Sequence, residues 1–584
     1  MILDKIDMPN DLKNLSINEM ETLAEEMRKL IIKKVNAIGG HMGPNLGIVE
    51  ATIALHYVFN FLSDKIIFDV SHQCYPHKIL TGRKDGYTNP ENYLKYSGYT
   101  APNESEFDIF QVGHTSTSIS LATGIAKARD LKGKKHNVVA LIGDGSLSGG
   151  EAYEGLNNAA TLESNIIIVV NDNDMSIAEN HGGLYNNLRQ LRNSQGKTSN
   201  NIFKALGFDY YYLEEGNNIQ KLIEIFEEVK DKNHPIVVHI KTEKGKGLDV
   251  AEVNKESFHW ILPGTLDINN DEEFALTEDY TSITCDFIER KIKEDKTVIA
   301  INAGTPGIFG FDKSFRRKVA PQYTDVGIAE EHAIAYASGL AKGGAKPIFA
   351  VMSSFIQRTY DQLSQDLCLN NSPITMLVYW GGISGADATH LCIFDIPLIS
   401  NIPNMVYLAP TTKEEHLAML EFANKQIMHP IAIRIPTCEL ISTNKKEKFG
   451  YDDINKFKVT EKGEKVAIIG LGSFYWLGKK VKEELNEKLG INATLINPRT
   501  ITGIDEEVLE NLKQNHEIVI TLEDGVLDGG FGEKITRFYG TSTMKVLNFG
   551  AKKEFTDSIP LEELYERYHL TKELIVEDIK NNLC

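Results

Sequence analysis

Short runs of β-branched residues alternate with helical patterns along this chain, and that alternation limits its fold more than any other feature. Three such runs are Val138 to Ile142, Ile166 to Val170 and Ile236 to Ile240, and a helical pattern from about Glu151 to Leu162 separates the first two. Parallel strands joined by crossover helices have this order. The sequence therefore predicts an α/β fold with mostly parallel sheets flanked by helices.

The same rhythm occurs three times, and 584 residues are too many for one hydrophobic core. We expect three domains, at residues 1–265, 280–442 and 458–584, separated by the polar stretch 263–273 and the charged stretch 443–456. A capping box of Ser16 and Glu19 begins the first helix, and Gly39-Gly40 ends it. The strands expected in the second and third domains are Val298–Asn302, Pro347–Val351, Ile374–Tyr379, Met405–Leu408, Ile431–Ile435, Val466–Ile469, Ala493–Ile496, Ile518–Leu522 and Val546–Asn548.

Charge and cysteine usage exclude several classes of partner. The chain carries 62 Lys and Arg against 81 Asp and Glu, a formal charge of −19, so we expect no nucleic-acid partner and no membrane-surface binding. Its six cysteines contain no CxxC pair, which favours a reducing compartment over a disulfide framework. We find neither an N-terminal signal pattern nor a membrane-spanning apolar run, and so expect a cytoplasmic protein.

Two predicted strands end in polar residues suited to a metal and a diphosphate. The run IGDGS (residues 142–146) follows one strand, and NDNDM (residues 171–175) follows the next, with 29 positions from Asp144 to Asn173 (173 minus 144). Adjacent parallel strands would bring these two side chains together, and their oxygens suit Mg²⁺. A GDG run alone is a common turn, whereas the two strand ends together predict a metal–diphosphate site.

This spacing is a signature of thiamin-diphosphate enzymes, and longer segments narrow the resemblance. Over nearly the whole chain, the sequence resembles the 1-deoxy-D-xylulose-5-phosphate synthase family, relatives of transketolase. The segments that carry the resemblance are residues 41–60, 68–83, 112–120, 171–180, 325–341, 353–363, 383–390 and 522–532. The resemblance implies a transketolase-like, thiamin-diphosphate-binding fold, thiamin diphosphate and Mg²⁺ as cofactors, small-molecule substrates and a homodimer.

The resemblance also implies a role for individual residues. Mg²⁺ is expected on Asp144, Asn173 and the Met175 carbonyl. The remaining cofactor-binding residues are expected to be His72, Gly113, His114, Thr115, Gly145, Ser146, Glu330, Phe355 and Arg358, with Asn173 shared between metal and cofactor. Glu330 would bind the pyrimidine ring and tune its protonation. The residues expected to take part in proton transfer with Glu330 are His41, His72, His114, His259, His390 and Asp387.

Four positions depart from the family pattern, all around the substrate or cofactor. Trp380 and Thr437 stand where the family has arginines that hold the acceptor phosphate, and Met352 and Leu248 replace tyrosines. Neither Trp nor Thr can form the bidentate bonds of a guanidinium. The polar stretch 186–201 is expected to be mobile, with an active-site lid shortened or replaced.

The resemblance implies a transferase that joins pyruvate to D-glyceraldehyde 3-phosphate with loss of CO₂, in isoprenoid and thiamin biosynthesis. The substituted arginines leave open a transketolase-like or acyloin-forming enzyme with a different, unphosphorylated or larger aldehyde acceptor. Two further alternatives are the E1 component of a 2-oxoacid dehydrogenase and a non-catalytic α/β binding protein.

Overall fold

The computed structural model describes residues 1–267 and 278–583, which form two compact units. Unit 1 comprises Met1–Ala275 with Gly327–Ala329, and unit 2 comprises Leu276–Val326 with Glu330–Cys584. The predicted linker at 263–273 begins in turns at residues 263–267, and its remainder lies outside the described residues.

Unit 1 is built on one parallel sheet of five strands in the order β1-β2-β3-β5-β4. The strands are β1 (Lys65–Phe68), β2 (Val138–Gly143), β3 (Ile166–Asp172), β4 (Asp209–Leu213) and β5 (Pro235–Lys241). The helices are α1 (Ile17–Ile38), α2 (Gly43–Gly47), α3 (Val49–Val58), α4 (Tyr75–Lys78), α5 (Asp85–Thr88), α6 (Ser118–Leu131), α7 (Gly150–Ala159), α8 (Gly183–Asn193), α9 (Ile202–Leu206), α10 (Ile219–Val229) and α11 (Asp249–Val253).

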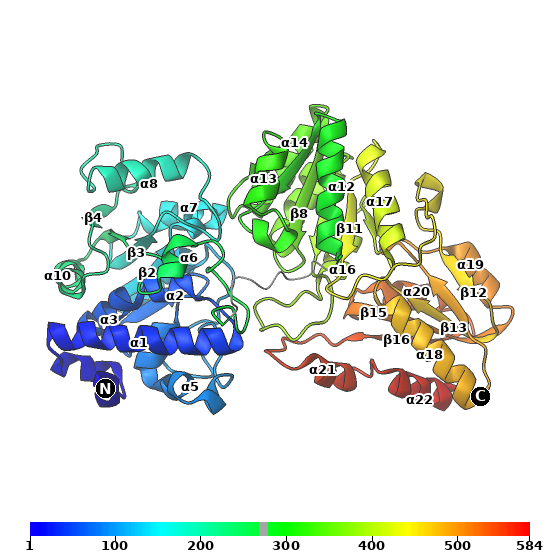
Figure 1. Ribbon diagram of the computed structural model, residues 1–584, viewed down its shortest axis with the longest axis horizontal. Coiled ribbons are helices and arrows are strands. Elements are labelled where there is room, and N and C mark those ends of the chain that lie inside the picture. The colour runs from blue at the N-terminus through cyan, green and yellow to red at the C-terminus, as the bar shows by residue number, and fades with distance from the viewer. Residues whose placement is uncertain (268–277, 584) are drawn as a thin grey trace. The chain divides into compact units, whose positions relative to one another are not determined.

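Successive residues of the central strands face opposite cores, as the two-residue period of a strand requires. Val139, Leu141 and Val169 pack with α1, α3 and α10, while Ile142 and Val170 pack with α6, α7 and α8 on the other face. Both faces are therefore buried, which explains why these strands are continuous apolar runs. The predicted capping box is confirmed at α1, the long blue helix of Figure 1, where Glu19 N donates to Ser16 Oγ and Ser16 N donates to the Glu19 carboxylate.

Unit 2 contains two sheets that share a core. The first is parallel, in the order β10-β11-β9-β8-β6-β7, and the second has the order β12-β14-β13-β15-β16 with one antiparallel pair, β12 with β14. Side chains of both sheets, including Val378 and Val519, meet in one apolar cluster. The strands are β6 (Val298–Asn302), β7 (Tyr323–Asp325), β8 (Lys346–Met352), β9 (Thr375–Tyr379), β10 (Val406–Leu408), β11 (Ile431–Ile435), β12 (Lys458–Glu461), β13 (Lys465–Gly470), β14 (Thr494–Asn497), β15 (His516–Val526) and β16 (Lys545–Ala551).

Helices flank both of these sheets. They are α12 (Tyr280–Glu294), α13 (Lys313–Val319), α14 (Glu330–Lys342), α15 (Tyr360–Gln362), α16 (Asp395–Ser400), α17 (Lys413–Lys425), α18 (Phe474–Leu489), α19 (Glu506–Leu512), α20 (Phe531–Tyr539), α21 (Leu561–Arg567) and α22 (Lys572–Asn582). Mostly parallel sheets with flanking helices confirm the predicted fold class. Every predicted strand has a counterpart, whereas β1, β4, β7 and β12 were not predicted.

The expectation of a mobile stretch at 186–201 is wrong for its first half. Residues up to Asn193 belong to α8, and Asn201 caps α9 by accepting from Phe203 N. Although α8 is polar overall, Tyr185, Leu188 and Leu191 recur at three-residue spacing and are buried. One apolar stripe is enough to hold a surface helix on a core.

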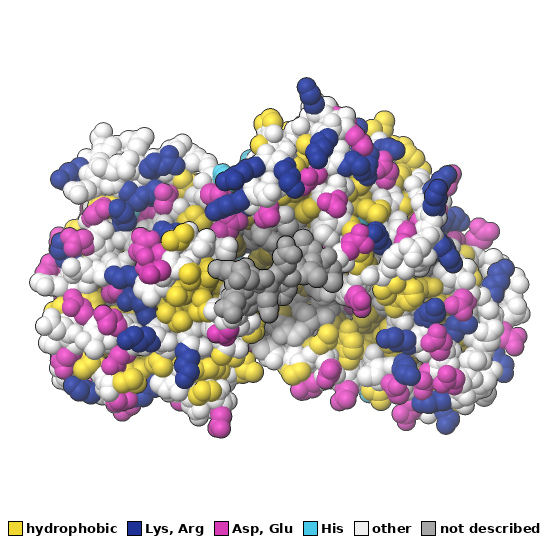
Figure 2. Space-filling view, viewed as in Figure 1, with side chains coloured by type: hydrophobic (Ala, Val, Ile, Leu, Met, Phe, Trp, Pro, Cys, Tyr) yellow, Lys and Arg dark blue, Asp and Glu magenta, His cyan; other side chains and the backbone are white. Residues whose placement is uncertain are grey.

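The surface carries mixed charge. On the face shown in Figure 2, acidic and basic side chains are interspersed over each unit. Among the described residues, no helix has the length and apolar content that a membrane span requires.

Candidate active site

The two predicted polar strand ends are adjacent in unit 1. Strands β2 and β3 pair in parallel with Gly143 opposite Asn171, and the Asp144 N–H donates to the Asn171 carbonyl at 3.1 Å. The residues after both strands therefore emerge at the same edge of the sheet, the carboxyl edge at which open α/β sheets bind ligands.

Residues 171–173 have different surroundings at that edge. Asn171 Oδ1 accepts a hydrogen bond from Thr242 Oγ1 at 2.5 Å. The Asp172 carboxylate is hydrogen-bonded to His239 and Arg192. Asn173 differs, because its Oδ1 is buried and has no hydrogen-bond partner in the described chain. A buried amide oxygen without a donor is costly, so Asn173 is the residue of this run that calls for a ligand.

The negative charge of the Asp144 carboxylate is also poorly compensated by its surroundings. It is 1% exposed, and burial, with the nearby Asp172 charge, raises its pKa well above its usual range. Asp144 Oδ2 accepts a hydrogen bond from Asn180 Nδ2 at 2.7 Å. A divalent cation would stabilise the charged form, so this donor set fits Mg²⁺.

The described residues contain no second candidate metal site made of ionisable side chains. Within residues 1–267 and 278–583, no group of three or more His, Cys, Asp or Glu side chains could hold a metal ion. The predicted set is of another kind, because it combines one carboxylate with amide and carbonyl oxygens.

The glycines of the turn after β2 have two different structural reasons. A Cβ on Gly143 would meet open space, which leaves room for a ligand beside the backbone. A Cβ on Gly145 would lie 2.7 Å from Ser176 Oγ, so packing against the residue after Met175 requires this glycine. Gly145 is therefore required by local packing, in addition to the cofactor-binding role that the resemblance implies for it.

A buried aspartate holds the predicted cofactor loop against this turn. Asp69 accepts hydrogen bonds from the backbone N–H groups of Ser116 at 2.8 Å and Ser118 at 3.1 Å. Ser116 Oγ in turn donates to the Ser146 carbonyl at 2.8 Å. Gly113, His114 and Thr115 directly precede this anchored point, so the structure brings two of the predicted diphosphate segments together.

Three of the predicted histidines form a cluster in unit 1. The ring of His41 lies 5.1 Å from that of His72 and 5.5 Å from that of His259, centroid to centroid. Burial and the nearby Lys244 lower the pKa of His259 well below its usual value. The His259 imidazole is therefore neutral near pH 7, and imidazole rings placed in this way can exchange protons with a substrate.

Lys244 is a site residue that the sequence interpretation did not select. It is 2% exposed, its Nζ donates to the Ser176 carbonyl at 2.5 Å, and it lies 3.1 Å from His259 Nδ1. Burial lowers its pKa to about 7. The signal available in the sequence was the Lys-Gly-Lys-Gly run at residues 244–247, which follows β5.

Unit 2 holds the remaining predicted residues. Glu330 begins α14, is 3% exposed, and burial raises its pKa to about 7. Arg358 Nη1 lies 3.7 Å from Glu330 Oε2, and this buried oxygen accepts no hydrogen bond from any described residue. An oxygen so placed is available to a ligand donor or acceptor.

Phe355, His390 and Asp387 accompany Glu330 in unit 2. The Phe355 and His390 rings are 5.7 Å apart, and His390 Nδ1 lies 3.4 Å from Asp387 Oδ1. Hydrogen bonds from Thr389 and His390 hold the pKa of Asp387 below its usual value against the opposing effect of burial.

The substituted phosphate positions lie beside a closed ion network. Arg434, on β11, donates from Nε to Asp395 at 2.6 Å and from Nη1 to Asp524 on β15, and it is 3% exposed. A Cβ on Gly381 would lie 2.6 Å from Arg434 Nε, so the turn after Trp380 packs directly on the guanidinium. Arg434 is fully engaged inside the fold, whereas Trp380 is 41% exposed.

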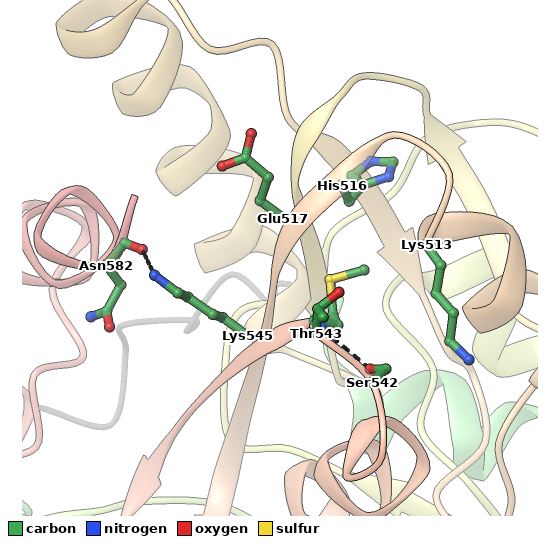
Figure 3. A pocket seen from close by; sticks show the side chains of 8 residues that line it. Lys513, His516, Glu517, Ser542, Thr543, Lys545 and Asn582 are labelled. Carbon is green, nitrogen blue, oxygen red and sulfur yellow. Dashed lines mark hydrogen bonds between the residues drawn. The ribbon is translucent and has the colours of Figure 1, made fainter. Parts of the chain in front are cut away.

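A further pocket of about 260 Å³ lies elsewhere in unit 2, lined by residues of the β15 and β16 starts (Figure 3). Two of its polar side chains have protein partners: His516 lies 3.1 Å from the Leu512 carbonyl and 2.8 Å from Thr494 Oγ1, and Lys545 Nζ donates to the Asn582 carbonyl at 2.7 Å. None of its lining residues belongs to the predicted site.

Comparison with known sequences identifies the class to which this fold and these residues belong. The transketolase pyrimidine-binding domain matches residues 278–441, and the transketolase C-terminal domain matches residues 455–575. The sequence model described as 1-deoxy-D-xylulose-5-phosphate synthase matches residues 3–200 and 195–242. The protein is thus built from transketolase-like domains.

Full-length relatives narrow this class to one family. Proteins named 1-deoxy-D-xylulose-5-phosphate synthase from Clostridium botulinum (strain Alaska E43 / Type E3) and Clostridium tetani (strain Massachusetts / E88) are each 37% identical to this chain, covering 97% and 99% of both sequences. The chain belongs to the 1-deoxy-D-xylulose-5-phosphate synthase family. A solved transketolase from Campylobacter jejuni is 17% identical, covers 97% of this chain and 100% of its own, and has a TM-score of 0.44.

Proposed function

We propose that this chain is a thiamin-diphosphate- and Mg²⁺-dependent transferase that forms 1-deoxy-D-xylulose 5-phosphate from pyruvate and D-glyceraldehyde 3-phosphate, releasing CO₂. Membership of the family supports the reaction. The observation that carries it to this chain's own residues is Glu330, a buried carboxyl with a pKa near neutrality and one oxygen without a hydrogen-bond partner in the described chain.

The residues described above divide the work of holding the cofactor. Asp144, Asn173 and the Met175 carbonyl would hold Mg²⁺. Gly145, Ser146 and the loop from Gly113 to Thr115, with His72, would hold the diphosphate. Phe355, Arg358 and Glu330 would hold the pyrimidine ring. Bound thiamin diphosphate supplies a nucleophilic carbon and a sink for the electron pair that decarboxylation releases.

The protein's own contribution is the placement of protons and charge. Glu330 holds a proton near neutral pH, because burial opposes its ionisation, and can donate it to a ring nitrogen. His41, His72, His114 and His259 would exchange protons with substrate oxygens, as would His390 held by Asp387. At the buried Glu330, the exclusion of water strengthens such interactions.

The Arg434 network favours a second candidate function, with an unphosphorylated or larger aldehyde as acceptor. The positive charge of Arg434 is already paired with Asp395 and Asp524, so it is not available to a phosphate. Trp380, exposed on the adjoining turn, provides an aromatic face in place of a cation.

Three further statements belong to the proposal. The domain boundaries are 1–265, 280–442 and 458–584, the protein acts as a homodimer, and it resides in the cytoplasm. The acidic charge of −19 and the absence of CxxC pairs support the last point.

The direct test is CO₂ release from pyruvate by purified protein with Mg²⁺ and thiamin diphosphate. D-Glyceraldehyde 3-phosphate is compared with D-glyceraldehyde and with no aldehyde. Stimulation by the phosphorylated aldehyde supports the first function, and preference for D-glyceraldehyde supports the second. Glu330→Gln should lower the rate at least about 100-fold, whereas the neighbouring Glu331→Gln should change it less than about twofold. No CO₂ release, or full activity of Glu330→Gln, would contradict the proposal.

A further inference from the structure

Helix α8 contacts both of the turns that carry the candidate metal ligands. Its inner face bears Tyr185, Leu188, Leu191 and Arg192, all buried, while Arg189 on the same helix is exposed. Leu188 and Leu191 join the apolar cluster that contains Ile142 and Val170 of β2 and β3. The helix is therefore packed on the two strands from which Asp144 and Asn173 emerge.

Tyr185 binds the turn after β2. Its hydroxyl lies 3.2 Å from the Asp144 carbonyl oxygen and 3.1 Å from the Gly145 carbonyl oxygen, and the side chain is 3% exposed. One donor thus serves two successive carbonyls, at the residue proposed to bind the metal and at the residue proposed to bind diphosphate. A movement of α8 would move this backbone.

Arg192 binds the turn after β3 on both sides of Asn173. Its Nη1 lies 2.8 and 2.7 Å from the two oxygens of Asp172, and its Nη2 lies 2.6 Å from Asp174 Oδ1. Asp174 has a backbone φ of +59°, a conformation that non-glycine residues rarely adopt without support. The guanidinium therefore spans the three residues whose central member carries the unpartnered Oδ1.

Other groups at Asp172 make this arrangement rigid rather than adjustable. His239 Nε2, from β5, lies 2.8 Å from Asp172 Oδ2, and Tyr210 of β4 lies 2.8 Å from His239 Nδ1. Without Arg192, the hydrogen-bond donors left to the buried Asp172 carboxylate would be His239 and the Asp174 backbone N–H, which lies 3.0 Å from Asp172 Oδ1. With the Arg192 cation gone, Asp172 would repel the nearby Asp144 carboxylate more strongly and push the two turns apart.

We propose that α8 is a brace that sets the separation of Asp144 and Asn173, with Tyr185 and Arg192 as positioning residues for the divalent cation. Neither side chain is a ligand. Their contacts hold the first turn by its carbonyls and the second by the two carboxylates that flank Asn173. The inference rests on the proposed metal site and adds to it a determinant of metal affinity.

The test is Mn²⁺ binding to the full chain in the presence of thiamin diphosphate, followed by the electron paramagnetic resonance signal of free Mn²⁺. Arg192→Gln should weaken Mn²⁺ binding at least about tenfold, and Tyr185→Phe about threefold. Arg189→Gln, on the exposed face of the same helix, should leave affinity within about twofold. Arg192→Lys should recover part of the loss, because an ammonium still neutralises Asp172.

Asp144→Asn separates failure of this inference from failure of the metal site. If Asp144→Asn binds Mn²⁺ as well as the unaltered protein, the site itself is wrong. If Asp144→Asn loses binding while Arg192→Gln and Arg189→Gln behave alike, the brace is wrong. Thermal unfolding of each variant without metal is measured alongside. Should Arg192→Gln fail to fold, Tyr185→Phe, which removes only one hydroxyl, decides the question by the same threefold criterion.

Discussion

Two regions differ in whether their buried polar groups have partners within the protein: the carboxyl edge of the unit 1 sheet, and the Arg434 network beside the turn after β9 in unit 2. At the first, the buried Asp144 carboxylate accepts a hydrogen bond from the Asn180 amide, and Asn173 Oδ1 has no hydrogen-bond partner in the described chain. At the second, Arg434 is buried between Asp395 and Asp524, and Asp524 also receives the Ser473 hydroxyl at 2.7 Å. An edge with unmet polar groups is prepared for a ligand, whereas one whose charges are paired serves the fold.

The largest expected effect comes from a substitution at the carboxyl edge of the unit 1 sheet. Asp144→Asn should lower Mg²⁺-dependent turnover at least about 10³-fold, about 4 kcal/mol of transition-state stabilisation, because it removes the only carboxylate of the proposed set. Steady-state rates over a Mg²⁺ titration measure this, with the exposed Asp249→Asn as control. Recovery of full activity at high Mg²⁺ would show that Asp144 contributes affinity alone.

The second prediction concerns the paired charges of the Arg434 network in unit 2. Arg434→Met should lower the free energy of unfolding by about 3–5 kcal/mol, since Asp395 and Asp524 would be left buried without their cation. Urea unfolding compares it with Arg290→Met, whose ion pairs are half exposed and are expected to contribute at most about 1 kcal/mol. Equal losses in the two variants would mean that burial does not decide the role of Arg434.

The third prediction concerns pH. The pKa of Glu330 is raised from 4.5 to about 7 in the folded protein, so folding favours its protonated form. Its ionisation therefore lowers stability as pH rises from about 4.5 to 7, by at most about 3 kcal/mol at higher pH. Glu330→Gln should raise the thermal midpoint at pH 8, have no such effect below pH 4.5, and lose activity. A midpoint difference that does not change with pH would contradict the assigned cause.

The smallest expected effect concerns Trp380 and the choice between a phosphorylated and an unphosphorylated aldehyde acceptor. Trp380→Arg places a cation beside the engaged Arg434 and should lower the KM for D-glyceraldehyde 3-phosphate about tenfold relative to D-glyceraldehyde, about 1.4 kcal/mol. Trp380→Leu removes the ring without adding charge and serves as the control. If both variants change the two aldehydes equally, the phosphate does not approach Trp380.

Local composition was enough to predict most of the buried strands, although it missed the four-residue strand β1, which is largely buried. The strands at 298–302 and 431–435 match the sequence expectation at both ends, because β-branched runs buried on two faces leave little ambiguity. The missed strands β4 and β12 are sheet edges with partly exposed residues, and β7 is only three residues long. Such strands carry a weak apolar signal.

The site residues also divide into those that local sequence patterns or the family resemblance identified and those that they missed. Asp144 and Asn173 could be found because each follows a recognisable strand, and the resemblance supplied Glu330 and the histidines. Asp69, Lys244 and Arg192 were not selected, because their importance lies in partners distant in sequence, such as the Ser116 N–H bound by Asp69 47 residues away.

The sequence by itself determined the α/β class, the family and the chemical types at the two strand ends, because these depend on local patterns and on long matched segments. Only the tertiary structure decided which of those groups remain available to a ligand. Arg434 is removed from ligand binding by Asp524, 90 residues away, and α8, polar in composition, becomes an ordered helix through a stripe of buried side chains. Pairing and burial are properties of neighbours in space, and those neighbours are set by the fold.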